Sequence, residues 1–129
     1  MKQGAKFERF FDVSEYVYNG FIKTFNDKNP LHTDEKYAKE KGFEAKVMHG
    51  NILGGFLSYF IGECLPEKNI IIHSQQIKFR RPVYLNDKLK LHGEITGAYE
   101  SVNALEIEFY FENQENVKVA TGSIRIGYI

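Results

Sequence analysis

The sequence predicts a single α+β domain in which a long antiparallel sheet curls around one buried helix. Three observations support this prediction: one nearly all-apolar helix in the middle of the chain, long strand-like runs after it, and short turns between those runs. A chain of 129 residues can bury most of its apolar surface around one core. No repeat, low-complexity run or linker divides residues 1–129, so we expect one domain.

The first half of the chain reads as mainly helical. Asp12 or Ser14 can cap a helix that runs to about Lys23. A second, short helix is expected to start near residues 33–34 and to end at Gly42.

The third predicted helix, residues 51–65, is the one that marks the fold. Its apolar residues recur in adjacent pairs every four positions, which makes a broad apolar stripe. Glu63 is its only charged residue, so we expect the helix to be buried on most sides, and Pro66 ends it. A separate row of small residues would let another backbone approach closely: Gly54, Ser58 and Gly62.

The second half alternates polar and apolar residues with the period of strands. Four runs are expected, at residues 70–80, 88–96, 105–111 and 117–128, joined by short turns as in an antiparallel sheet. The last run changes phase near Gly122, which predicts a β-bulge there. A sheet of this length covers one apolar helix best by curling around it, which is the hot-dog arrangement.

Composition excludes several classes of protein. Lys plus Arg and Asp plus Glu number 17 each, which argues against nucleic-acid or anionic-membrane partners. Cys64 is the single cysteine, so neither an intramolecular disulfide nor a cysteine-based zinc cluster can form. The N-terminal residues lack an apolar signal-peptide core and no stretch approaches the roughly 20 apolar residues of a membrane span, so we expect a cytoplasmic domain.

The densest cluster of chemically active residues lies at residues 25–34. Asp27 and His32 flank a turn that Pro30 restricts, close enough to converge on one small group. A carboxylate and an imidazole that share a water form a general acid/base pair. The alternative is structural: Asp27 and Asn29 make an Asx turn, and His32 caps the following helix.

These residues resemble the motif of the MaoC-like hydratase/dehydratase family, which includes the R-specific enoyl-CoA hydratases. The resemblance rests on Asp-x-Asn-Pro-Leu-His at residues 27–32 and on His-Gly at residues 49–50, and it continues through residues 77–87. Two positions depart from the family pattern. Asn26 stands where a Gly or another small or acidic residue is usual, and Asn51 stands where many members carry Met or Leu.

The resemblance implies a hydro-lyase that reversibly hydrates a trans-2-enoyl thioester to the R-3-hydroxyacyl form. By analogy, Asp27 and His32 hold the catalytic water; which is base and which is acid stays open, because the pair can titrate as a unit. Asn29 would orient the water or the His32 ring. The backbone N–H of Gly50, at a helix start, would bind the thioester oxygen as it gains charge.

The remaining site assignments concern the substrate. Asn51 and His49 are expected in the substrate pocket, His49 mainly as a partner of backbone groups. One or two of Lys78, Arg80 and Arg81 should meet the phosphates of coenzyme A or an acyl carrier protein; strand alternation prevents all three from facing one ligand. The histidines show no convincing metal spacing, so we expect no metal and no cofactor.

Three other functions stay open. A hot-dog thioesterase would use a carboxylate on the long helix, where Glu63 is the only candidate and lies far from Gly50. A non-catalytic acyl-thioester-binding module would not require Asp27 with His32. A specialised dehydratase would fit the polar Asn51. Edge strands and the resemblance both favour a homodimer or higher oligomer. Acyl length, carrier and physiological direction are not predicted.

Overall fold

The computed structural model describes all 129 residues, which form one five-stranded antiparallel sheet, four α-helices, one π-helical turn and one 3₁₀ turn. The strands are β1 (Lys6–Asp12), β2 (Ile70–Phe79), β3 (Lys88–Tyr99), β4 (Ala104–Glu112) and β5 (Lys118–Tyr128). The helices are α1 (Glu15–Phe25), α2 (Pro30–Thr33), α3 (Glu35–Glu40) and α4 (Asn51–Tyr59), with a π-helical turn at Phe60–Cys64 and a 3₁₀ turn at Glu100–Val102. The strand order is β1-β3-β4-β5-β2.

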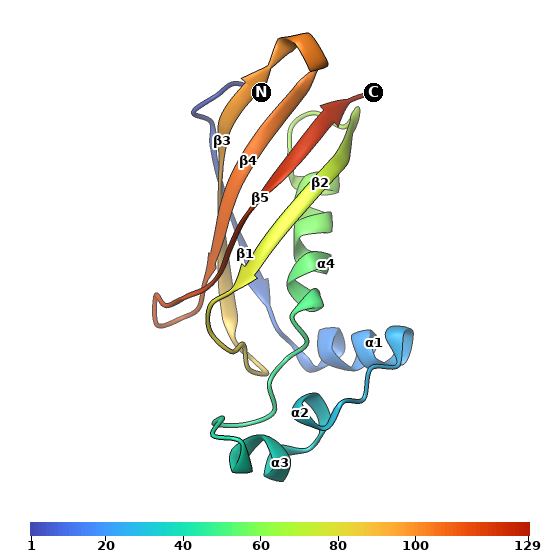
Figure 1. Ribbon diagram of the computed structural model, residues 1–129, viewed down its shortest axis with the longest axis vertical. Coiled ribbons are helices and arrows are strands. Elements are labelled where there is room, and N and C mark those ends of the chain that lie inside the picture. Colours follow the sequence, from blue (N-terminus) through green and yellow to red (C-terminus); the bar gives the residue numbers. More distant parts are fainter.

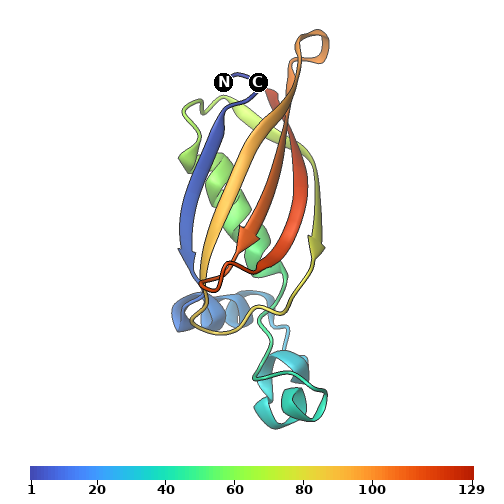
Figure 2. The same ribbon diagram turned by 90° about the vertical axis from the view of Figure 1, so that its left-hand side faces the viewer.

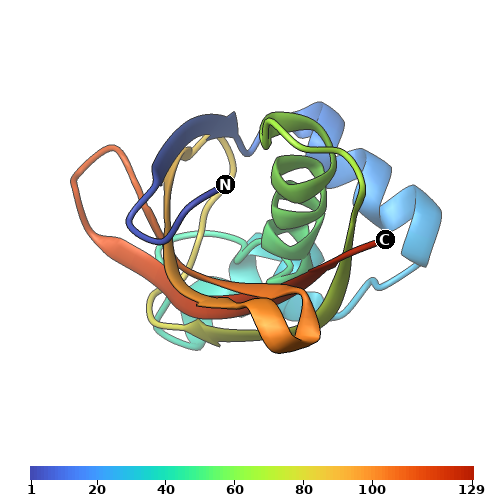
Figure 3. The ribbon, with the colours of Figure 1, turned by 90° about the horizontal axis from the view of Figure 1, so that it is seen from above.

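The sheet curls around α4, which confirms the predicted hot-dog fold (Figures 1 and 3). The helices α1, α2 and α3 gather at one end of the sheet, and both chain termini lie at the opposite end (Figures 1 and 2). The turn that follows α1 and the start of α4 therefore meet at the same end of the molecule (Figure 1).

Alternation along the strands builds the core, as the sequence predicted. In β3 and β4 every second residue is buried against α4, including Leu91 and Ile107, which are fully buried. From α4 and its π-helical turn, Leu53, Leu57 and Phe60 fill the space inside the curl. This one apolar cluster supplies most of the burial that holds the sheet and α4 together.

The helical elements follow their predicted caps with one addition. Ser14 rather than Asp12 caps α1, by accepting a hydrogen bond from the Val17 N–H. Asp34 caps α3 by accepting from the Tyr37 N–H. The addition is α2: the residues expected to form only a turn make a short helix, since Pro30 suits the first helical position.

The expectation of four strands was wrong, because residues 6–12 form a fifth strand, β1, paired with β3. Its inward residues are Phe7 and Phe11. The Phe11 ring stacks on Phe56 of α4 with ring centroids 4.6 Å apart. The outward residues between them, Glu8 and Phe10, are exposed. The two-residue alternation of a strand was therefore present in the sequence, but over only a few residues.

The bulge predicted near Gly122 in the last strand is present, three residues earlier, at Val119. Register shifts where Phe111 and Glu112 of β4 pair with Ala120 and Lys118 of β5, which leaves Val119 as the extra residue. Gly122 pairs regularly, but a Cβ there would stand 2.0 Å from the Gln76 carbonyl oxygen of β2. The glycine therefore allows close approach of two strands, not a bulge.

Gly122→Ala should lower the free energy of unfolding by about 3 kcal/mol, the upper end of typical overpacking costs, because the atom in the way is backbone. The urea midpoint measures this effect. Gly20→Ala is the matched control: Gly20 is exposed in α1 with nothing near its Cβ position, so the change should stabilise by up to about 1 kcal/mol. A wild-type midpoint for Gly122→Ala would contradict the prediction.

The prediction that α4 is buried on most sides was also wrong. One side of the helix is exposed along its length, at Asn51, Gly55, Ser58 and Tyr59. Nothing lies within 4 Å of a Cβ at Gly54 or Gly62, so no backbone of this chain uses the small-residue row. No helix in the structure has both the length and the apolar character that crossing a membrane would require.

Candidate active site

The turn after α1 is shaped by three consecutive local interactions. Asn26 caps α1 in the left-handed region with φ 60°, a conformation that glycine and asparagine adopt most readily. The Asp27 Oδ1 accepts a hydrogen bond from the Asn29 N–H at 3.2 Å, which is an Asx turn. The Asn29 Oδ1 accepts from the Leu31 N–H at 3.0 Å and caps α2. The structural alternative and the catalytic prediction are therefore compatible.

His32 projects from α2 with a defined tautomer. Its Nδ1 lies 2.7 Å from the Val47 carbonyl oxygen. A carbonyl only accepts, so Nδ1 is the donor, and Nε2 is left without a partner in the chain. The Tyr18 hydroxyl donates to the His32 carbonyl oxygen at 2.5 Å and anchors the same residue from α1. The Nδ1–H of His32 is therefore held by the backbone, which leaves Nε2 available for a substrate or a water.

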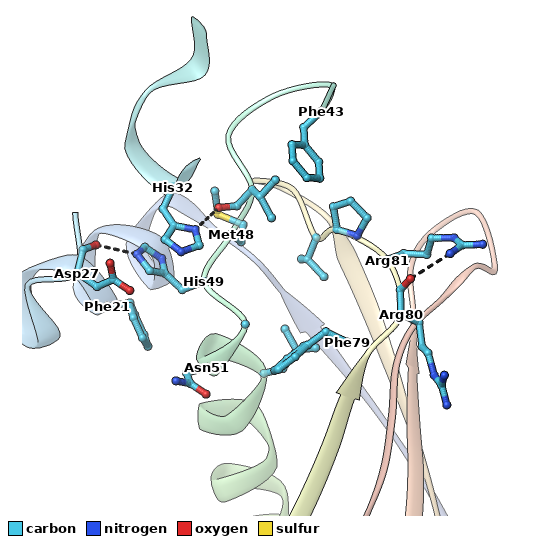
Figure 4. Close-up of a pocket in the computed structure, with 15 residues that line it drawn as sticks. Phe21, Asp27, His32, Phe43, Met48, His49, Asn51, Phe79, Arg80 and Arg81 are labelled. Carbon is cyan, nitrogen blue, oxygen red and sulfur yellow. Dashed lines mark hydrogen bonds between the residues drawn. The ribbon is translucent and has the colours of Figure 1, made fainter. Parts of the chain in front are cut away.

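Tertiary packing brings a third residue to this pair. Asp27, His32 and His49 place side-chain ligand atoms within 4.8 Å of one another (Figure 4). All three line a cavity of about 500 Å³ between the α1–α2 turn, the start of α4 and the end of β2. Asp27 is exposed, His32 is half-buried and His49 is buried, so solvent exposure decreases across the group.

Gly50 lies on the wall of the same cavity, directly before α4. Its backbone N–H donates to no other group in the chain. A Cβ on Gly50 would stand 2.9 Å from the Phe79 ring, so any side chain there would require this ring to move. The position combines a free donor with the positive end of a helix dipole, as the predicted oxyanion site requires.

The other predicted residues divide between the cavity and its surroundings. Asn51, Arg80 and Arg81 line it. Lys78 does not; it lies in a polar groove on the outer face of the sheet, which Arg80 also borders. Asn29 does not line it either, since its side chain caps α2 instead of contacting the His32 ring. Lys78 and Arg80 point to the same face of the strand, as the alternation of side chains along a strand predicted.

Aromatic residues of the site were not predicted. Phe21 and Phe79 stand on opposite sides of the cavity (Figure 4). Phe21 and Asn51 also border a second, mainly apolar cavity of about 560 Å³ between α1 and α4. The amphipathic period of α1 could have marked Phe21 as inward-facing, whereas nothing in the local pattern relates Phe79 to Gly50.

We expected no metal site, but the fold brings Asp27, His32 and His49 together in a cluster that the sequence spacing did not indicate. Two of its nitrogens are already engaged, since His32 Nδ1 faces Val47 O and His49 Nε2 faces Asp27 O. The remaining atoms are one nitrogen on each ring and the Asp27 carboxylate. Turnover that is unchanged after treatment with EDTA would support the prediction that the reaction needs no metal.

A sheet curled around a helix, with an Asp/His pair and a free backbone donor at the helix start, defines a hot-dog protein whose polar groups gather in one cavity. The chain belongs to the MaoC-like family: the family model described as MaoC like domain matches residues 2–117. The resemblance read from residues 27–32 and 49–50 is thereby confirmed.

Similar proteins include two hydratases and one solved structure. The (R)-specific enoyl-CoA hydratase of Aeromonas caviae is 32% identical over 98 residues, covering 76% of this chain and 72% of that protein. The enzyme of the same name from Rhodospirillum rubrum is 31% identical over 97 residues, with coverages of 75% and 67%. The structure of the A. caviae (R)-hydratase superposes with TM-score 0.91 and 25% identity over 100% of this chain and 98% of that one.

Proposed function

We propose that this protein is a hydro-lyase that reversibly adds water to a trans-2-enoyl thioester to form the R-3-hydroxyacyl thioester. The observation that carries the proposal is the arrangement of the Asp27 carboxylate and the His32 imidazole on one cavity wall with the free N–H of Gly50. The similarity to R-specific enoyl-CoA hydratases supports the reaction and its stereochemistry.

The geometry suits the charge that develops during hydration. A water bound between Asp27 and His32 loses a proton to one of them as its oxygen bonds to the β-carbon. The electron pair of the C=C bond moves toward the thioester oxygen, which the Gly50 N–H and the start of α4 stabilise. The proton then goes to the α-carbon. Dehydration runs through the same states in reverse.

The experiment that tests the proposal is hydration of crotonyl-CoA by the wild-type protein, followed as loss of the enoyl-thioester absorbance. Chiral analysis of the product should show the R-3-hydroxybutyryl thioester. Absence of turnover with short and long enoyl thioesters, carried on coenzyme A and on an acyl carrier protein, would refute the proposed function.

The carrier phosphates are proposed to lie at Arg81 and Arg80, which border the cavity, rather than at Lys78. Arg81→Ala should raise KM for crotonyl-CoA about tenfold, since losing one charge-assisted contact of about 1.4 kcal/mol has this effect. Lys78→Ala is the matched control and should leave KM unchanged. Crotonyl-N-acetylcysteamine, which lacks the phosphates, should not distinguish Arg81→Ala from wild type; an equal loss with both substrates would contradict the assignment.

The acyl chain is proposed to extend from the water site into the apolar cavity between α1 and α4. Asp27, Phe21 and Asn51 border both cavities, so the chain would pass directly from one to the other. The wall of the second cavity is formed largely by apolar side chains and glycines, including Val17, Phe56 and Gly55.

A homodimer is proposed as the assembled form. The exposed side of α4 carries small residues and a Tyr59 that is 56% exposed, next to the edge strand β2 with its exposed Ile71. A second copy would cover both features. Sedimentation velocity at micromolar concentration should give a dimer, and a monomer at all concentrations would contradict this proposal.

The competing functions receive no support from the geometry. Glu63, the carboxylate that a thioesterase would need, is exposed in the π-helical turn at the end of α4 away from Gly50 and lines neither cavity. A module that only binds acyl thioesters would not require the His32 imidazole beside the Asp27 carboxylate.

A further inference from the structure

His49 is a buried histidine held in a stack of rings. Its side chain lies between Phe21, at 4.6 Å between ring centroids, and His32, at 4.0 Å with the ring planes 30° apart. Only 2% of the residue is exposed. The Val47 hydrogen bond holds the edge of the His32 imidazole at Nδ1, and the His49 ring supports one of its faces.

The hydrogen bonds of His49 define its tautomer. Its Nε2 lies 2.9 Å from the Asp27 carbonyl oxygen (Figure 4). The carbonyl only accepts, so Nε2 is the donor, and in this tautomer Nδ1 is an acceptor.

The other nitrogen of His49 shows that this arrangement has a cost. Nδ1 is buried and has no hydrogen-bond partner. An unpaired buried acceptor typically costs about 1–3 kcal/mol. A phenylalanine would stack between Phe21 and His32 without that cost, so the feature that histidine adds is the Nε2–H donor to Asp27.

We propose that His49 is a positioning residue that ties the acid/base pair to the oxyanion donor. Its Nε2–H holds the backbone of Asp27, its ring face carries His32, and its own carbonyl is bonded to the nitrogen of Gly50. Asp27 and His32 lie 22 and 17 residues before His49, and Gly50 follows it directly, so the His49 side chain and backbone together link the three. This inference rests on the proposed hydratase function and adds a residue to it.

A residue of this kind should affect kcat more than KM. It touches no substrate carrier, but misplacement of reacting groups by about 1 Å can cost about 10²-fold in rate. His49→Phe keeps the ring and loses the donor, whereas His49→Gln places an amide donor near the Nε2 position and loses the ring. The pair therefore separates the hydrogen bond from the stacking.

The test measures kcat and KM for crotonyl-CoA with wild type, both variants and His92→Phe, a control histidine on the outer face of the sheet. We expect His49→Phe to lose about 10²-fold in kcat with KM within about twofold, and His49→Gln to recover part of that loss. Wild-type kcat in His49→Phe, a loss confined to KM, or a loss no greater than that of His92→Phe would overturn the proposal.

A second measurement does not depend on turnover. Nitrogen NMR of the imidazoles should show the His32 Nδ1–H exchanging slowly with solvent in the wild type, and at least about tenfold faster in His49→Gln, where the supporting ring is gone. Unchanged exchange in folded His49→Gln would overturn the positioning role. An inactive wild type with the expected exchange pattern would instead refute the hydratase function and leave the positioning of His32 supported.

Discussion

Asp27→Asn should lower kcat for enoyl-thioester hydration by about 10²–10⁴-fold, the usual contribution of a positioned general acid or base. The asparagine keeps Oδ1, which accepts from the Asn29 N–H, so the turn is expected to persist. What disappears is the negative charge and the ability to take up a proton. Steady-state kinetics with crotonyl-CoA measures the loss, and circular dichroism checks the fold.

The control for this substitution is Asp34→Asn. The Asp34 carboxylate caps α3 through the Tyr37 N–H, and it lines neither cavity. Neutralising it removes the same charge from the same end of the molecule without touching the site. Equal losses of kcat in both variants would mean that charge in this region, rather than acid/base chemistry at Asp27, supports turnover.

His32→Asn should produce a loss of the same order, about 10²–10⁴-fold in kcat. The asparagine amide can donate to the Val47 carbonyl in place of Nδ1, so the hydrogen bond that orients the residue survives. The basic Nε2 is removed. The two single variants and the double variant should not add, because residues that act on one water work as a unit.

Tyr18→Phe separates positioning from chemistry at His32. The Tyr18 hydroxyl donates to the His32 carbonyl oxygen and does not contact the ring nitrogens. Its removal should cost about tenfold or less in kcat, because Val47 and His49 still hold the imidazole. If Tyr18→Phe were as damaging as His32→Asn, the loss in His32→Asn would reflect a displaced backbone instead of a missing base.

The parts of the site formed by residues close together in the chain could be predicted from the local sequence. The turn at residues 26–32 depends on Pro30, on the short polar side chains of Asp27 and Asn29, and on an asparagine that accepts φ 60°. The departure at Asn26 is explained in the same way, since asparagine tolerates the left-handed conformation that glycine adopts freely. A contact between the Asn29 side chain and the His32 ring, one of the two expected roles of Asn29, is not observed, because the Asn29 Oδ1 accepts from the Leu31 N–H instead.

Long-range packing decided the parts that the sequence pattern left out. His49 reaches Asp27 and His32 because α4 starts where the α1–α2 turn ends, and Phe79 reaches Gly50 because β2 finishes beside the same point. The strand β1 was missed because its inward residues are few and depend on α4 for burial. The exposed side of α4 was not predicted, because the hydrophobicity of a segment does not show whether other residues of the same chain cover it.

The sequence by itself predicted the hot-dog architecture and the proximity of Asp27 and His32, since periodicity and turn chemistry are local properties, and its motifs indicated the family. Only the tertiary structure decided the tautomers of His32 and His49, the free donor at Gly50 and the separation of Lys78 from Arg81. The physical reason is that a hydrogen bond or a cavity wall needs two partners, and here the partners come from segments far apart in the chain.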